Sequence, residues 1–243
     1  MTRITPAPRR GLRFTGFLSA LILCLCSLQA AATVVPGTLV ISEFMANPAA
    51  VSDTAGEWLE LFNTTPNAID ANGLTLTDNG SDLHVIDNGG PLLVGSGDYL
   101  LLARGADPAS NGGLTPDYVY SGFVLGNSSD AIVLSDGATE IARIDYDSSL
   151  VAAGQSAELL ALPGAFGNYA LTPASLTYGN GDIGTPGAAG SVALPVAAVP
   201  VPAALWLLFS GIGGLAVCAR RAGVCAADHD TADDITSRGL TAI

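Results

Sequence analysis

The 243-residue chain carries 22 acidic and 9 basic residues, a formal net charge of −13. Within residues 37–190 the imbalance is steeper, because 18 Asp or Glu face only Arg104 and Arg143. So acidic a segment repels phosphate backbones, which excludes nucleic acid as its partner. All 4 cysteines lie outside this segment, so no disulfide can form within it. Its stability must come from a hydrophobic core, which roughly 150 residues are enough to bury.

The first 32 residues have the pattern of a secretory signal peptide. Arginines at positions 3, 9, 10 and 13 precede an apolar run over residues 14–26, and three alanines at 30–32 supply a site for signal peptidase. We therefore expect residues 1–32 to direct export and then to be removed.

Short apolar runs separated by turn residues follow this leader, and no amphipathic helix interrupts them. The runs that we expect to be strands are residues 38–43, 57–63, 74–77, 99–103, 131–135, 141–146 and 157–162. Regular short strands joined by Asn-Gly and Asp-Gly turns favour an all-β, antiparallel β-sandwich over a parallel α/β sheet.

The second of these runs contains a glutamate between aromatic residues. Strand alternation places Leu59 and Leu61 on one face. It places Trp58, Glu60 and Phe62 on the other, so Glu60 lies between two aromatic side chains.

Several blocks of sequence resemble one family. Residues 39–48, 56–63 and 73–78 are similar to the opening of the lamin tail domain, and residues 98–103, 125–130 and 184–188 are similar to its later parts. The resemblance spans residues 37–190. It implies an immunoglobulin-like antiparallel β-sandwich that serves outside the cell as a binding or structural appendage.

Few residues could support catalysis. His84 has no evident Ser or Cys nucleophile, and no Gly-x-Ser-x-Gly elbow occurs. The pairs Asp145/Asp147 and Glu57/Glu60 have the residue type that a glycosidase needs, but such pairs are expected in so acidic a segment. We therefore assign no catalytic residue and expect no enzyme.

Two turns contain the hard oxygen donors that calcium prefers, at residues 70–73 and 78–82. Neither follows the spacing of an EF-hand loop, and Asn or Asp before Gly is explained by hairpin turns alone. We assign no cofactor and no metal ligand, and calcium remains an alternative.

The C-terminal part is hydrophobic. Residues 187–198 are small and apolar and are expected to form a linker, and residues 204–219 form an uncharged run. Cations on one side only orient such a segment in a bilayer and leave what precedes it outside the cytoplasm. We expect one transmembrane helix, a sorting motif before it and a membrane stop after it: Val199, Pro200, Val201, Pro202 and Ala203, then Arg220 and Arg221.

Residues 199–221 resemble the PEP-CTERM sorting signals of Gram-negative bacteria, in a Val-Pro-x-Pro-Ala variant. The resemblance implies that an exosortase-type membrane protease cuts near the proline motif. The protein would then pass from the inner membrane to the cell surface, usually in organisms that make exopolysaccharide. Residues 222–243 continue beyond the arginines as a polar tail, expected to be cytoplasmic.

Together these patterns predict an exported, surface-displayed, non-catalytic β-sandwich that contributes to the extracellular matrix or to surface interactions. Its expected partners are signal peptidase, the exosortase-type protease and the membrane, with extracellular polysaccharide or surface proteins as further candidates. Two alternatives stay open. One is an accessory or hydrolytic protein, nuclease- or phosphodiesterase-like, that acts on extracellular polymers, and the other is a permanently membrane-anchored ectodomain.

Overall fold

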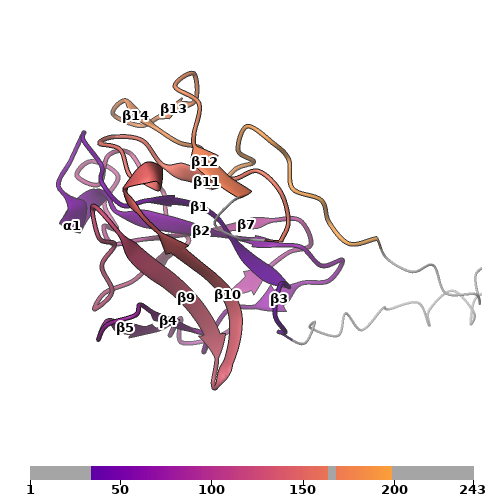
Figure 1. Cartoon of the computed structure of the whole chain (residues 1–243). Helices are drawn as coiled ribbons and strands as arrows, with labels where there is room; N and C mark the ends of the chain where they lie inside the picture. The colour runs from indigo at the N-terminus through magenta and orange to yellow at the C-terminus, as the bar shows by residue number, and fades with distance from the viewer. Residues whose placement is uncertain (1–33, 164–167, 199–243) are drawn as a thin grey trace, which may run out of the picture. The chain divides into compact units, whose positions relative to one another are not determined.

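A computed structural model of the chain describes residues 34–163 and 168–198 (Figure 1). The chain divides into two units, residues 1–197 and 198–243. The expected signal peptide, sorting motif, membrane helix with Arg220 and Arg221, and polar tail lie outside the described residues. No helix within the described ranges has the length and apolar character needed to cross a membrane.

The described chain is almost entirely strand, with one short α-helix, α1 (Asp53–Gly56), and one 3-10 turn, η1 (Ser148–Leu150). The strands are β1 (Leu39–Met45), β2 (Trp58–Asn63), β3 (Ile69–Asp70), β4 (Thr75–Thr77), β5 (Leu83–Val85), β6 (Leu93–Val94), β7 (Tyr99–Ala103), β8 (Tyr118–Val119), β9 (Asp130–Asp136), β10 (Thr139–Tyr146), β11 (Ala157–Leu159), β12 (Tyr169–Leu171), β13 (Thr177–Tyr178) and β14 (Asp182–Ile183). The all-β expectation is confirmed, and each run predicted to be a strand coincides with one: β1, β2, β4, β7, β9, β10 and β11.

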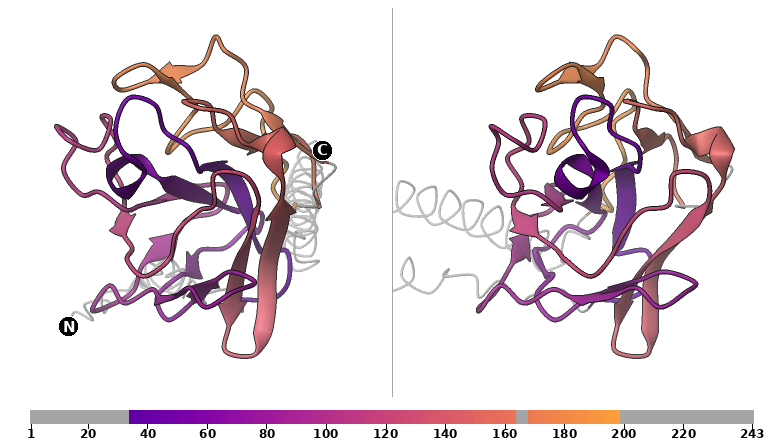
Figure 2. Two further views of the ribbon diagram at one scale, coloured as in Figure 1. Left: turned by 60° about the vertical axis from the view of Figure 1, so that its left-hand side comes forward. Right: turned by 90° about the vertical axis from the view of Figure 1, so that its left-hand side faces the viewer.

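Two larger sheets form the sandwich. One has the strand order β12-β11-β1-β2-β7-β8, the other β10-β9-β4-β5, and two small ribbons pair β13 with β14 and β3 with β6. The pairs are antiparallel except β7 and β8, where Leu102 lies beside Tyr118 in parallel register. Figure 2 shows the long β9–β10 hairpin, whose turn projects at the bottom of both views.

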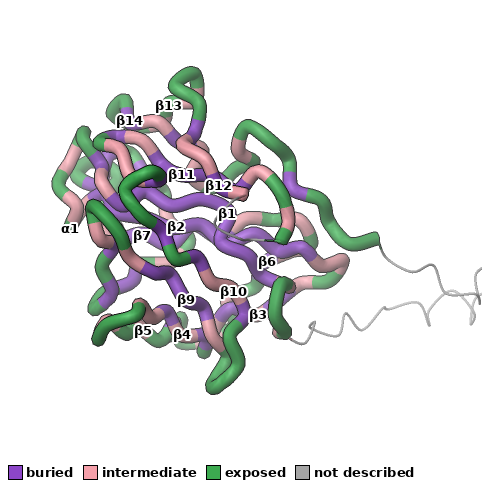
Figure 3. Tube along the Cα trace, in the orientation of Figure 1, coloured by how far each residue is buried: buried purple, intermediate pink, exposed green. Residues whose placement is uncertain are grey.

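The two sheets enclose the main hydrophobic core. Leu59 and Leu61 of β2 contribute to it from the larger sheet, and Leu76 of β4 and Leu134 of β9 contribute from the smaller one. All four side chains are 0% exposed. Burial of one such leucine stabilises the fold by roughly 1.5–3 kcal/mol. Figure 3 shows the consequence, because β1 and β2 are buried along their whole length while the turns are exposed.

The other face of the larger sheet is also buried. Cross-strand partners share a face, and the register aligns Met45, Trp58 and Ala103 across β1, β2 and β7. These residues form a separate small cluster with Leu101 and Leu114. The predicted alternation along β2 is therefore confirmed, but both of its faces are covered.

The cover includes residues 184–197, which we call the C-terminal strap. The sequence predicts a linker at residues 187–198, yet Leu194 is only 9% exposed and belongs to the main core. The Ala197 amide donates to the Thr64 carbonyl at 2.7 Å. Small residues also allow the strap to lie close to the sheet. A Cβ at Gly190, for example, would collide with the Glu158 carboxylate. The strap is thus a third layer of the fold instead of a free tether.

Candidate functional site

Three buried glutamates lie side by side on the strap-covered face of the larger sheet. Glu43 of β1 pairs across the sheet with Glu158 of β11 on one side and with Glu60 of β2 on the other. Their exposed fractions are 1%, 2% and 1%, respectively. We call these three side chains the acidic row. Charged groups at this depth require hydrogen-bond partners.

Glu60 receives its partners from a neighbouring strand and from the strap. Ser42 Oγ donates to Glu60 Oε1 at 2.6 Å, and the Gly187 amide donates to Glu60 Oε2 at 2.6 Å. Ser42 lies where the β1–β2 register shifts, between Ile41 and Glu43. The irregularity in β1 thus brings a hydroxyl to the glutamate of the adjacent strand.

The other two members of the row are held in the same way. Glu43 accepts hydrogen bonds from Ser156 Oγ at 2.5 Å and from the Thr185 amide at 2.9 Å. Glu158 accepts from the amide and the hydroxyl of Ser191, at 2.6 and 2.5 Å. Each carboxyl group of the row therefore binds a different residue of the strap, and together they clamp it to the sheet.

Burial makes the charged forms of Glu43 and Glu60 unfavourable. It raises the pKa of Glu60 to about 8, an effect that the Ser42 hydroxyl opposes and that nearby Glu43 reinforces. Burial raises the pKa of Glu43 as well, although Ser156 and Thr185 donate to it. A protonated Glu60 also has hydrogen-bond partners. Its carboxyl group can donate a hydrogen bond to Ser42 Oγ, while the Ser42 hydroxyl donates to the Glu60 backbone carbonyl oxygen at 3.2 Å. At neutral pH Glu60 therefore favours its protonated form.

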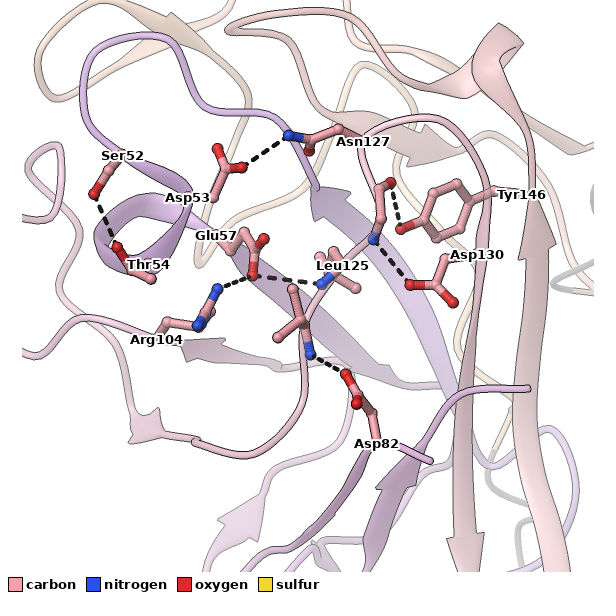
Figure 4. Close-up of polar contacts among 12 residues, drawn as sticks. Ser52, Asp53, Thr54, Glu57, Asp82, Arg104, Leu125, Asn127, Asp130 and Tyr146 are labelled. Atoms are coloured by element: carbon pink, nitrogen blue, oxygen red, sulfur yellow. Dashed lines mark hydrogen bonds and ion pairs between the residues drawn. The ribbon is translucent and has the colours of Figure 1, made fainter. Parts of the chain in front are cut away.

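A further buried acid, Glu57, lies directly before β2 (Figure 4). Glu57 forms an ion pair with Arg104, with 2.8 Å between Oε2 and Nη1 and side-chain exposures of 1% and 18%. Burial raises the pKa of Glu57 to about 7, while Arg104 lowers it. Among the described residues Glu57 Oε1 and the Tyr120 hydroxyl are buried without a hydrogen-bond partner. Arg104 therefore carries most of the compensation for this buried charge.

Glu57 also belongs to a set of carboxylates that fixes one loop. The successive amides of residues 124, 125 and 126 donate to Asp82, Glu57 and Asp130, at 3.0, 3.4 and 2.9 Å. The Asn127 side chain donates to Asp53 of α1 at 2.8 Å. Figure 4 shows how these acids come from separate elements and converge on the loop. The abundant acids in this region thus have structural partners within the chain.

Residues 32–148 match the Lamin Tail Domain family model. The part of the β-sandwich up to residue 148 is therefore similar to a lamin tail domain, as the resemblance in the sequence indicates. None of the curated proteins compared with the chain matches it. The match includes Glu43, Glu57 and Glu60, but it ends before β11, β12 and the strap, which complete the sandwich in this chain.

The lamin-tail-like sandwich separates the carboxylate pairs that the sequence raised for catalysis. Glu57 contacts Arg104 on one side of the sheet and Glu60 contacts the strap on the other, so the two are not brought together. Asp145 binds Arg143, which lowers its pKa. Asp147 instead accepts from the Ser149 amide at the start of η1, at 2.8 Å.

His84 also has structural partners. Its Nδ1 lies 2.9 Å from the Ser121 carbonyl oxygen, and its Nε2 lies 2.9 Å from the Tyr118 hydroxyl. Tyr118 belongs to the last strand of the larger sheet and His84 to the last strand of the smaller one. The histidine therefore joins the two sheets at their edges.

The turns considered for calcium use their carboxylates as turn caps. Asp78 Oδ1 accepts from the amides of Gly80 and Asp82, at 2.8 and 3.0 Å. Asp70 Oδ1 accepts from the amides of Asn72 and Leu92, at 3.0 and 2.9 Å. Over residues 34–163 and 168–198, no group of at least three His, Cys, Asp or Glu is placed to hold a metal ion.

A groove of about 460 Å³ opens beside β6 and β7. Its lining includes the exposed side chains of Leu93, Asp98 and Asp117, and the half-buried ring of Tyr99. Tyr99 packs on Phe62 with 4.9 Å between ring centroids, which fixes the ring at the wall of the groove. This is a concave, solvent-accessible surface that combines an aromatic ring with carboxylates.

Sequence reasoning missed Arg104, Glu158 and the strap residues that bind the acidic row. The available signal was a glutamate inside each of three apolar strand runs, at positions 43, 60 and 158. A charged residue in such a run indicates either a solvent-exposed face or a buried partner, and alternation alone does not distinguish them.

Proposed function

We propose that the protein is an exported, cell-surface-displayed, non-catalytic module with a lamin-tail-like sandwich. An exosortase-type protease would sort it, and it would contribute to the extracellular matrix or to surface interactions. One observation carries the proposal. An acidic, cysteine-free sandwich stands between a leader-like segment and an uncharged run whose only flanking cations are Arg220 and Arg221.

The proline motif supports sorting over simple anchoring. Pro200 and Pro202 have fixed φ angles and no amide donor, so they favour an extended chain where it enters the bilayer. An extended segment is the form in which a protease binds its substrate. This argument favours processing near residues 199–203.

The contacts of the buried acids support a non-catalytic role. Donors from the chain itself occupy the oxygens of Glu43, Glu60 and Glu158, and the strap covers them. Binding at the surface is then the remaining mode of action, and the groove beside Tyr99 offers a concave surface for it.

The test is the fate of the C-terminus in the producing cell. We expect intact-mass analysis of surface-released protein to give an end within residues 199–203. The double variant Pro200→Ala/Pro202→Ala should stay in the membrane with Arg220 and Arg221 retained, whereas Pro116→Ala within the sandwich should be released normally. Wild-type protein that keeps both arginines favours the anchored ectodomain. Full-length protein with its leader in the cytosol contradicts export.

The hydrolytic alternative has its own assay. The purified mature chain should show no phosphodiesterase activity with added divalent cations. Turnover that is lost in Glu60→Gln, while the circular dichroism spectrum is unchanged, would instead favour an enzyme acting on extracellular polymers.

A further inference from the structure

The first and last parts of the sandwich meet at one residue, Thr64. Its amide donates to the Thr38 carbonyl at 3.0 Å, and its hydroxyl donates to the Gly37 carbonyl at 2.7 Å. Its own carbonyl accepts the Ala197 amide at 2.7 Å. The chain therefore enters and leaves the sandwich at the same place.

The contact at Ala197 leaves almost no free chain before the hydrophobic segment. Ala198 alone separates this anchored residue from Val199, the first residue of the proline motif. One residue spans at most about 3.6 Å, so the sandwich cannot stand far from whatever holds residue 199. The strap provides no slack, because Leu194 is buried in the core and Ser191 is bound to Glu158.

The segments that meet around Thr64 form an uncharged surface. We call it the exit surface, and it consists of residues 34–38, 63–68, 95–97 and 195–197. These segments are joined by the bonds of Thr64 and by the Gly97 amide, which donates to the Asn63 carbonyl at 3.1 Å. They contain no charged residue, although residues 37–190 hold 18 acids.

Two valines are exposed on this uncharged surface. Val35 is 45% exposed and Val196 is 40% exposed. Asp98, which follows Gly97, lies at its border, and Glu140 and Arg143 line the same groove as Gly37. Figure 1 shows α1 on the opposite side of the sandwich from β3, which directly follows the exit surface.

We propose that the exit surface lies against the lipid headgroups of the membrane while the chain is held by its C-terminal hydrophobic segment. The inference rests on the proposed function, which supplies that membrane segment. An anionic bilayer repels the acidic faces of the domain, by an amount on the order of 1 kcal/mol for each charge near the surface. The exit surface carries no charge and exposes two valines next to the point where the chain leaves the sandwich, so it can approach the bilayer, and α1 then points away from the membrane.

Depth-dependent quenching tests this orientation with the full mature chain. The protein is reconstituted through its own C-terminal segment into vesicles of phosphatidylcholine and phosphatidylglycerol that contain headgroup-nitroxide lipid. Single-cysteine variants Val35→Cys, Val196→Cys and Thr54→Cys, the last in α1, carry a fluorophore in a background with Cys218→Ser and Cys225→Ser. We expect at least threefold stronger quenching at positions 35 and 196 than at 54. Equal quenching, or stronger quenching at 54, overturns the proposal.

A charge variant provides a second measurement. Val196→Asp places a carboxylate on the exit surface at an exposed position, and it should at least halve the quenching of a label at position 35. Thr54→Asp adds the same charge on the α1 side and should leave that quenching unchanged. Flotation with the vesicles tests the membrane segment separately from the orientation of the domain. Protein that does not float contradicts the proposed membrane segment, whereas protein that floats with uniform quenching contradicts only the orientation.

Discussion

The amide of Gly187 donates to Glu60 Oε2 at 2.6 Å, joining residues that are 127 positions apart in the chain. Glu60 lies in the second strand of the sandwich and Gly187 in its last segment. The contact closes a face that carries Trp58 and Glu60, both at most 1% exposed. A buried carboxyl group with a raised pKa therefore couples the closing of the strap to protonation.

Glu60→Gln should change the pH dependence of stability. The pKa of Glu60 is raised to about 8 in the folded protein, so its favourable contribution is full below the ordinary value of 4.5 and is lost as the pH rises through 8. Wild-type protein should lose on the order of 3–5 kcal/mol of unfolding free energy from this group between pH 4 and pH 9. Urea unfolding should show Glu60→Gln to be more stable than wild type at pH 9 and no more stable at pH 5.

The matched control for this prediction is Glu140→Gln. Glu140 is an exposed residue of β10, so the same chemical change should leave the pH profile within about 0.5 kcal/mol of wild type. A wild-type protein whose stability increases between pH 5 and pH 9 would contradict the protonation of Glu60 in the folded protein.

The two arginines of the sandwich should differ strongly when they are replaced. Arg104→Met leaves Glu57 as an uncompensated buried charge and should cost about 3–5 kcal/mol. Arg143→Met removes exposed pairs with Asp145 and Glu140 and should cost less than about 1 kcal/mol. Thermal unfolding at pH 8 measures both. Since a neutral Glu57 needs its cation less, the cost of Arg104→Met should shrink at pH 5, and equal costs for the two arginines would refute this account.

The region that matches the lamin tail domain should not fold alone. A fragment ending at residue 148 lacks β11, which pairs with β1, and it lacks the strap over Glu60 and Trp58. We expect residues 33–148 to have a disordered circular dichroism spectrum and residues 33–198 to unfold cooperatively. A cooperative transition in the shorter fragment would show that the third layer is dispensable.

A single hydroxyl in the strap should matter despite its position near the surface. Ser191→Ala removes the hydroxyl bond to buried Glu158 and should cost about 1–3 kcal/mol. Ser128→Ala, at an exposed position in the loop after β8, should be neutral within about 0.5 kcal/mol. Hydrogen exchange provides a second readout, because the amides of residues 187 and 191 should lose protection in Ser191→Ala and keep it in Ser128→Ala.

Calcium should have little effect on this protein. The carboxylates of Asp70 and Asp78 already accept backbone amides, so we expect millimolar calcium or EDTA to shift Tm by less than about 1 °C. A calcium-dependent rise in Tm that disappears in Asp78→Asn would establish a site at the turn of residues 78–82.

Much of the sandwich could be predicted because long strands repeat a visible pattern. Residues 99–103 and 131–135 are continuous apolar runs bounded by turn residues, and they become β7 and β9. The strands that were missed have two or three residues, such as β6, β8 and β14. Such short segments are stabilised by the neighbours they pair with, which local sequence does not reveal.

The environment of Glu60 illustrates the limit more sharply. Alternation correctly placed it between Trp58 and Phe62, but it could not show that this face is buried. The cover comes from residues near 187, a small and apolar stretch that has no periodicity and was predicted to be a linker. Small residues suit both a free tether and a chain packed closely on a sheet, and only the distant glutamates distinguish the two.

If the protein is exported as proposed, the strap constrains the order in which the domain is completed. A polypeptide that crosses a bilayer from its N-terminus delivers Trp58 and Glu60 to the far compartment long before residues 184–197 emerge. Until those residues arrive, the outer surface of the larger sheet remains uncovered. In a chain exported as proposed, the domain is completed only as the hydrophobic run of residues 204–219 reaches the translocation machinery, so the finished sandwich and the proposed membrane attachment would be acquired almost simultaneously.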